Sequence, residues 1–343
     1  MVATAGGAVL VTGSEEPTEV HLWRVVPGAA PERLTDGVGQ HAATAAGPVL
    51  VVTRADLEHD TTATTVHAPG RPPLAIASVA QSPGLVPRPQ LLRAGPRELR
   101  CALLLPDRPG AGAAAAGSLP VLLDPYGGPH HRQVLAARDR FLVSQWFADQ
   151  GFAVLVTDGR GTPGRGPGWE RAVWRDLAGP VLDDQVEALL AVAADHRQLD
   201  LAKVAIRGWS FGGYLAALAV LRRPDVFHAA VAGAPVTDWR LYDTHYTERY
   251  LGHPAADPDA YRRSSLLADA AKLERPLLLV HGLADDNVVA AHTLRLSGLL
   301  LTAGRPHNVL PLSGVTHLAA QEAVAENLLH LQLAFLRDAL GLT

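Results

Sequence analysis

The pattern of apolar and polar positions divides the chain into two parts. In residues 1–85, short apolar runs alternate with Gly and Pro turn residues, and no helical period competes. These runs predict strands of an antiparallel sheet at residues 8–12, 20–26, 49–53 and 64–67. About four strands with weakly apolar faces make a poor core by themselves. We therefore expect this part to pack against another domain for stability, and the chain to begin partway through a longer β architecture.

A proline-rich passage at residues 82–89 cannot continue a sheet and indicates an extended linker. It divides the chain into domains 1–85 and 86–343. After a strand at 99–105 and a flexible Gly/Ala surface loop at 110–117, strands and amphipathic helices alternate. We expect strands at 121–124, 153–157, 204–207, 229–232, 277–281 and 308–311, and helices at 138–150, 182–196, 212–222, 290–303 and 319–339. This alternation requires parallel strands with crossover helices, which predicts a doubly wound α/β sheet.

Composition, charge and cysteine content argue against several classes of function. With 48% apolar and 19% charged residues and a net charge of -4, the chain is typical of a soluble globular protein. The absence of a basic stripe argues against nucleic-acid binding, and no apolar run is long enough to span a membrane. The only cysteine, Cys101, excludes an internal disulfide and a thiolate metal site, and its apolar neighbours predict a buried residue. With no secretory leader visible, we expect a cytoplasmic protein.

The strongest chemical signal surrounds Ser210. Residues 203–214, Lys-Val-Ala-Ile-Arg-Gly-Trp-Ser-Phe-Gly-Gly-Tyr, run from an apolar strand through Gly-x-Ser-x-Gly directly into a helix. This is the context of a nucleophile elbow, in which Gly208 and Gly212 leave room for the adjoining strand and helix. The pattern predicts an α/β-hydrolase fold with Ser210 as its nucleophile.

A serine hydroxyl needs a base and an orienting carboxylate, which follow in the order Ser, acid, His in this fold. Asp285 and Asp286 both lie in the loop after the strand at 277–281, and the spacing alone leaves the two open. His317 lies after the last strand and before the final helix, where the base belongs. Other histidines are weaker candidates for the base. His281 ends a strand, which indicates a core residue, and His307 precedes its strand. His130 and His131 are adjacent, but two adjacent histidines without further ligands do not indicate a metal site.

Acyl transfer also needs donors for the developing oxyanion. One is the backbone amide after the nucleophile, that of Phe211. The second normally comes from the loop after an earlier strand, here Asp-Pro-Tyr-Gly-Gly-Pro-His at 124–130. Its Tyr126 is either a phenolic donor or a half-buried packing residue.

The chain resembles the prolyl oligopeptidase family, and within it the dipeptidyl-peptidase IV-like branch, in which a β-propeller caps an α/β-hydrolase domain. The similarity extends from about Leu119 to the end of the chain. Five motifs carry it, in order: Leu-Leu-Asp-Pro-Tyr-Gly-Gly-Pro (122–129), Asp-Gly-Arg-Gly (158–161), Gly-Trp-Ser-Phe-Gly-Gly-Tyr (208–214), Tyr-Asp-Thr-His-Tyr-Thr-Glu-Arg-Tyr (242–250) and His-Gly-Leu-Ala-Asp-Asp-Asn (281–287). Residues 1–85 then resemble the last part of a propeller.

The resemblance implies roles for individual residues. It selects Asp285 over Asp286, completes a triad of Ser210, Asp285 and His317, and assigns Tyr126 with the Phe211 amide to the oxyanion hole. Asp286 is then expected to bond nearby backbone amides. The resemblance also implies a substrate pocket for proline or a small residue, shaped by Tyr242, Tyr246, Val236, Trp239 and Val288, with Asn287 holding a substrate carbonyl. It implies a peptide substrate, no cofactor, and a possible homodimer.

Two departures from the family pattern are visible. The paired glutamates that bind a free substrate amine lie upstream of residues present here, and the Glu15-Glu16 pair indicates a solvated turn instead. Leu318 follows His317 where a glycine is common. The leading hypothesis is a serine peptidase that works through an acyl-enzyme. Its alternatives are a carboxylesterase of the same fold and a truncated chain without activity, because an incomplete propeller leaves strand edges unpaired.

Overall fold

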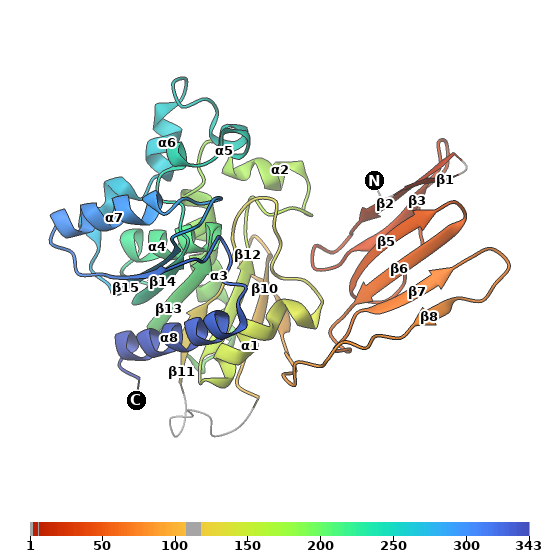
Figure 1. Cartoon of the computed structure of the whole chain (residues 1–343), viewed down its shortest axis with the longest axis horizontal. Coiled ribbons are helices and arrows are strands. Elements are labelled where there is room, and N and C mark those ends of the chain that lie inside the picture. Colours follow the sequence, from red (N-terminus) through yellow and green to blue (C-terminus); the bar gives the residue numbers. More distant parts are fainter. Residues whose placement is uncertain (1–2, 6, 108–117, 343) are drawn as a thin grey trace.

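The computed structural model describes residues 3–5, 7–107 and 118–342, which form two lobes (Figure 1). The N-terminal lobe contains two four-stranded antiparallel sheets, ordered β1-β2-β3-β4 and β5-β6-β7-β8. The strands are β1 (Ala3–Ala5), β2 (Ala8–Gly13), β3 (His21–Val25), β4 (Glu32–Arg33), β5 (Gln40–Ala46), β6 (Val49–Ala55), β7 (Ala63–His67) and β8 (Leu74–Ile76). The expectation of about four strands was wrong, because β1, β4 and β8 have at most three residues and β5 is rich in alanine.

The second lobe is built on an eight-stranded sheet with the order β16-β15-β14-β13-β11-β12-β10-β9. Its strands are β9 (Gln90–Ala94), β10 (Leu99–Leu104), β11 (Leu119–Leu123), β12 (Ala153–Asp158), β13 (Leu199–Trp209), β14 (Ala229–Gly233), β15 (Leu277–Gly282) and β16 (Asn308–Leu312). Neighbours from β12 to β16 pair in parallel, whereas β10 pairs antiparallel with β12 and β9. This mostly parallel sheet confirms the predicted fold class.

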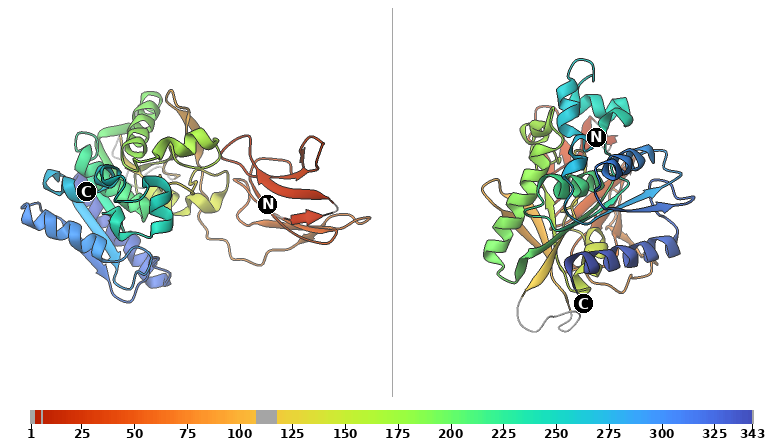
Figure 2. Two further views of the ribbon diagram at one scale, coloured as in Figure 1. Left: turned by 90° about the horizontal axis from the view of Figure 1, so that it is seen from above. Right: turned by 90° about the vertical axis from the view of Figure 1, so that its left-hand side faces the viewer.

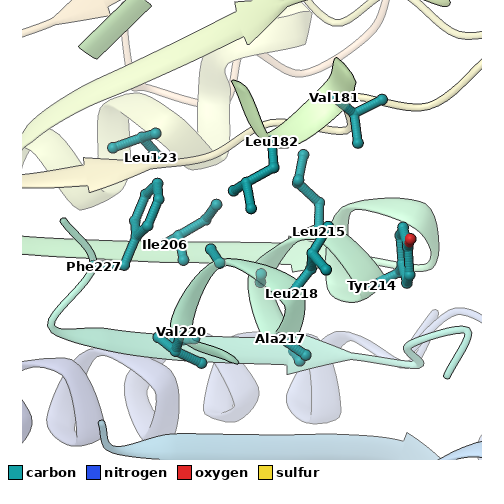
Figure 3. Packing of buried hydrophobic residues seen from close by; sticks show 14 of the residues in the cluster. Leu123, Val181, Leu182, Ile206, Tyr214, Leu215, Ala217, Leu218, Val220 and Phe227 are labelled. Carbon is teal, nitrogen blue, oxygen red and sulfur yellow. The ribbon is translucent and has the colours of Figure 1, made fainter. Parts of the chain in front are cut away.

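Helices cover both faces of the sheet, as the right-hand view of Figure 2 shows. One face packs against α1 (Leu142–Asp149) and α8 (Glu322–Leu340), and the other against α3 (Gly179–Asp195), α4 (Phe211–Arg222) and α7 (Ala291–Thr302). In Figure 3, Ile206 of β13, Leu182 of α3 and Leu215 of α4 meet in the second of these layers. Each such fully buried side chain contributes roughly 1.5–3 kcal/mol of hydrophobic stabilisation.

Several elements differ from the sequence prediction. The predicted helix at 138–150 is a 3-10 turn (Arg138–Phe141) followed by α1. The pattern missed β9 and the short helices α2 (Pro167–Glu170), α5 (Thr244–Leu251) and α6 (Pro258–Ser264). The expected loop at 110–117 lies outside the described residues. Between β8 and β9 the chain forms no regular element, and the domain boundary at 85/86 stays a prediction.

Polar contacts join the two lobes. Glu16, in the turn after β2, accepts hydrogen bonds from Arg100 at 2.6 Å and from Arg93 at 2.7 Å. The expectation of a solvated Glu15-Glu16 pair was therefore wrong for Glu16. Partial burial alone would raise the pKa of Glu16, but the two guanidinium groups outweigh burial and lower it. The backbone amides of Ala136 and Arg138 also donate across the junction, to the carbonyls of Thr18 and Asp56.

Cys101 is fully buried in β10, and burial raises the pKa of its thiol to about 12, which confirms an inert buried residue. Within the described ranges, no helix has the length and apolar character needed to cross a membrane.

Candidate active site

The chain turns sharply at Ser210, between β13 and α4. Ser210 has φ 59° and ψ -116°, a positive-φ conformation outside the regions allowed for residues with a side chain. The turn is held because the Ser210 amide donates to the Gly233 carbonyl at 2.8 Å. A Cβ on Gly208 would lie 2.3 Å from backbone atoms of Gly212, and a Cβ on Gly212 would lie 2.6 Å from the Pro125 carbonyl oxygen. The two glycines are therefore required by this turn, as the motif predicted.

Asp285 and His317 form an acid and base pair in which the acid is buried and the base is partly exposed. The imidazole Nδ1 of His317 lies 2.8 Å from the Asp285 Oδ2. An ionised carboxylate only accepts hydrogen bonds, so Nδ1 carries the proton and Nε2 is left as the basic nitrogen. The second oxygen of Asp285 accepts from the backbone amides of Asn287 and Val288, both at 2.9 Å. The Asp285 side chain is fully buried, whereas that of His317 is 20% exposed.

The structure distinguishes Asp285 from Asp286 as the acid, and His317 from His281 as the base. Asp286 is exposed and forms no hydrogen bond within the described residues, so its expected role in bonding backbone amides was wrong. That role belongs to Asp285. His281 is buried, and its two ring nitrogens lie 2.7 Å from the Thr293 hydroxyl and the Val288 carbonyl. It is a satisfied core residue, as expected.

The base lies beside the nucleophile strand. The indole Nε1 of Trp209 donates to the His317 carbonyl at 2.7 Å. Ser210, Asp285 and His317 follow β13, β15 and β16, and the carboxyl ends of parallel strands meet at one edge of a sheet. Within the described residues no hydrogen bond joins the Ser210 hydroxyl to the His317 imidazole, a contact that often tightens only when substrate binds. The structure therefore brings the three predicted residues to one edge.

Tyr126 and Phe211 also lie at this edge. Phe211 is the first residue of α4, where a backbone N–H has no acceptor inside the helix. The ring of Tyr126 lies 6.1 Å from that of Phe211, measured between centroids. Burial raises the pKa of the Tyr126 phenol, and a hydrogen bond with the Ser210 side chain acts in the opposite direction. The phenol stays protonated at neutral pH and remains a donor next to the nucleophile.

An ion pair fixes the loop that carries Tyr126. Arg207 of β13 donates to Asp124 at 2.7 Å, and the Ser144 hydroxyl donates to the other oxygen of Asp124 at 2.8 Å. Further along, Asp158 accepts from the backbone amides of Gln133 and Val134 at about 3 Å. The motifs at 122–129 and 158–161 contain Asp124 and Asp158, but the sequence did not predict that these carboxylates hold the Tyr126 loop in place.

The predicted pocket residues lie together near Ser210. Val236, Trp239 and Val288 are almost completely buried, whereas Tyr242 and Tyr246 are half-buried. Trp239 stacks on Tyr246 with ring centroids 6.0 Å apart, and the Tyr242 hydroxyl donates to Asn287 at 3.2 Å. The carboxylate of Asp243 caps α5 by accepting from the Tyr246 amide at 2.8 Å.

Sequence reasoning missed two residues of this aromatic wall. Tyr250 lies one turn after Tyr246 on α5, and their ring centroids are 5.0 Å apart. His130 has a left-handed φ of 67° and is hydrogen bonded through Nε2 to the Tyr250 hydroxyl. The four-residue spacing of Tyr246 and Tyr250 was a usable signal, because residues four apart share one helix face, whereas Tyr242 lies before α5 in extended backbone. In the described residues, no group of three or more His, Cys, Asp or Glu side chains is arranged to hold a metal ion.

The fold and the arrangement at the sheet edge define this chain as an α/β-hydrolase with a Ser, Asp and His arrangement. A model of the prolyl oligopeptidase family matches residues 139–343, and the chain belongs to that family. Its relatives place it in the dipeptidyl-peptidase IV-like branch.

Curated relatives match just over half of the chain. Dipeptidyl peptidase 8 of Mus musculus and of Homo sapiens is 42% identical over 198 residues, which is 55% of this chain and 22% of that protein. Prolyl endopeptidase FAP of Homo sapiens is 33% identical over 187 residues, 54% of this chain and 24% of that protein. The matched part is thus about a quarter of these relatives' length.

A solved structure matches both lobes. The crystal structure of dipeptidyl peptidase 4 from Porphyromonas gingivalis superposes with a TM-score of 0.87 at 26% identity. The match covers 98% of this chain and 49% of that one, so the chain spans about half of the solved protein. The N-terminal sheets are included in this likeness.

Proposed function

We propose that this chain is the catalytic part of a serine peptidase that cleaves peptides after proline or a small residue, in the manner of a dipeptidyl peptidase. One observation carries the proposal: the Asp285–His317 pair lies at the same sheet edge as the strained Ser210, beside a cluster of aromatic side chains. The similarity to proteins named dipeptidyl peptidase and prolyl endopeptidase supports it.

The proposed acylation step follows from the hydrogen bonds. His317 Nε2 accepts the proton of the Ser210 hydroxyl while the Ser210 Oγ attacks the substrate carbonyl. Asp285 holds the imidazole through Nδ1 and stabilises the imidazolium that forms. The Tyr126 phenol and the Phe211 amide donate to the oxyanion. The C–N bond then breaks, His317 gives its proton to the leaving amine, and water releases the acyl group by the reverse sequence.

The aromatic pocket supplies the proposed preference. Val236, Trp239 and Val288 are buried, and the half-buried rings of Tyr242 and Tyr246 meet edge to face with their centroids 5.5 Å apart. An apolar aromatic surface of this kind suits the pyrrolidine ring of proline, and Asn287, which contacts Tyr242, offers an amide to a substrate carbonyl.

Hydrolysis of a Gly-Pro chromogenic amide by the purified chain, beside the Ser210→Ala variant, tests this proposal. We expect turnover that the variant loses. If the chain cleaves only an acetate ester in a Ser210-dependent way, it acts here as a carboxylesterase. If it cleaves neither, it is inactive as isolated, and both results contradict the proposed peptidase activity.

A cytoplasmic location and a homodimer also stay proposals. The lone buried Cys101 suits a reducing compartment, where disulfides are rare. Leu294 and Leu301 of α7 are 62% and 76% exposed, which suits an association surface. Sedimentation velocity of the purified chain measures its oligomeric state and so tests the proposed homodimer.

A further inference from the structure

A second pocket adjoins the aromatic wall of the candidate active site. It has a volume of about 360 Å³ and lies between α5 and residues 159–175, which contain α2 and are called the α2 segment here. The helices α2 and α5 stand next to each other in Figure 1. The side chains that matter for its chemistry are His130, Glu170, Arg171, Trp174, Arg249 and Tyr250. None of these residues has a role in the acylation step above.

The walls of this pocket are fixed by backbone contacts. The Arg175 amide donates to the Tyr250 carbonyl at 2.8 Å, which ties the end of the α2 segment to α5. Inside the segment, the Gly161 amide donates to the Trp169 carbonyl at 3.1 Å, and the Trp169 indole donates to the Gly159 carbonyl at 3.0 Å. The pocket is therefore a formed feature of the fold.

The pocket shares residues with the substrate-binding wall. Tyr250 lines it and lies 5.0 Å from Tyr246, measured between ring centroids. His130 also lines it, contacts Tyr250, and lies 6.1 Å from the Tyr246 ring. A peptide residue next to the one held by Tyr246 is thus within reach of the second pocket.

The charges in the pocket favour an anion. Arg171, Arg249 and Glu170 are exposed, and within the described residues none of them forms an ion pair. Two guanidinium groups against one carboxylate leave a net positive charge. Burial lowers the pKa of His130, and the positive charge of Arg249 lowers it further, more than Glu170 raises it. Trp174, whose side chain is half exposed, adds an apolar wall.

We propose that this pocket is a subsite for a carboxylate of the peptide substrate, held by Arg249 and Arg171 against Trp174 and Tyr250. The inference rests on the proposed peptidase function and adds a preference for acidic peptides. Arginine binds carboxylates through two parallel hydrogen bonds. Because the site is open to water, the gain is modest, about fivefold in affinity. The carboxylate is an acidic side chain on the substrate residue before proline, because the carbonyl of proline itself lies at Ser210.

Calorimetric binding to the Ser210→Ala variant tests the subsite without turnover. The probes are Glu-Pro-amide and Gln-Pro-amide, which differ only in the side-chain carboxylate. We expect Glu-Pro-amide to bind about fivefold more tightly. Adding Arg249→Gln should abolish that preference. Arg262→Gln, at an exposed arginine that contacts Asp259, is the matched control and should keep it.

Equal or undetectable binding of the two amides would overturn the subsite, as would a preference for Glu-Pro-amide that survives both Arg249→Gln and Arg171→Gln. The same chain with Ser210 intact is assayed in parallel with Gly-Pro and Glu-Pro chromogenic amides. A carboxylate preference without any hydrolysis contradicts the proposed peptidase activity but not the anion site. Hydrolysis without a preference contradicts the subsite alone.

Discussion

At the scale of single residues, one of two adjacent carboxylates orients His317. Asp285 and Asp286 are adjacent in the chain, yet the first is buried against the imidazole and two backbone amides, and the second is exposed. Sequence alone left the pair open, because two consecutive residues in a loop have the same spacing to every motif. The difference arises from the direction in which the folded loop turns each side chain.

Replacing Asp285 by Asn should reduce kcat about 10³–10⁴-fold, because an amide in place of the carboxylate favours the wrong imidazole tautomer. Asp286→Asn is the matched control and should change kcat less than about twofold. Steady-state kinetics on whichever substrate the chain cleaves measures both. Equal losses in the two variants would contradict the assignment.

Tyr126→Phe keeps the ring and removes only the phenolic donor. We expect kcat to fall about 10²–10³-fold with little change in KM, because the oxyanion forms only after the substrate is bound. A rise in KM at unchanged kcat would instead indicate that Tyr126 is a packing residue of the substrate pocket.

At the scale of elements, sequence patterns predicted those structures whose stabilising contacts lie within a few residues of each other. Gly208, Ser210 and Gly212 fix their own turn, so the elbow between β13 and α4 was predictable. The helix α5 was not predicted, because its residues 244–251 are mostly polar or aromatic and pack through tyrosines. The bond from Trp209 to His317 joins residues 108 positions apart, and no local pattern contains it.

Asp158 anchors the Tyr126 loop at a cost in stability. Burial raises the pKa of Asp158 from 3.8 to about 6, although the backbone donors of Gln133 and Val134 act against that rise. Its contribution is therefore present below pH 3.8 and is lost as the pH rises through about 6. His292 acts in the opposite sense over a similar range, because burial lowers its pKa to about 4.

We therefore expect the Asp158→Asn variant to gain stability relative to the wild type as the pH rises, by up to about 3 kcal/mol between about pH 4 and 7. Urea denaturation at a series of pH values measures the free energy of unfolding of both proteins. The difference between the two curves removes the shared contribution of His292. The exposed Asp195→Asn is the control, and a flat difference for Asp158→Asn would contradict the prediction.

At the scale of the whole molecule, the two lobes depend on one another. The N-terminal sheets have few fully buried side chains, whereas the eight-stranded sheet lies between two apolar layers. The sequence predicted that residues 1–85 would need support, because their apolar runs are short. It did not reveal that Glu16 supplies part of that support, since its partner Arg100 is 84 positions away.

Glu16→Gln should lower the free energy of unfolding by about 1–3 kcal/mol, because it leaves the Arg100 guanidinium, only 10% exposed, without its carboxylate. Because the folded pKa of Glu16 is lowered, this stabilisation is present above its ordinary value of 4.5 and is lost as the pH falls. Chemical denaturation at pH 7 measures the loss. Glu15→Gln, at the exposed neighbour, should have no effect, and equal effects of the two variants would contradict the interpretation.

The central claim is that Ser210, Asp285 and His317 act as one nucleophilic unit, and covalent labelling with a fluorophosphonate followed by peptide mapping tests it most directly. This reagent reports an activated serine whether or not the peptide-binding surface is complete. We predict one label per chain, on Ser210, lost in Ser210→Ala and slowed at least about 10²-fold in His317→Ala. Labelling at other serines, or labelling of Ser210 that is unaffected by His317→Ala, would contradict the account.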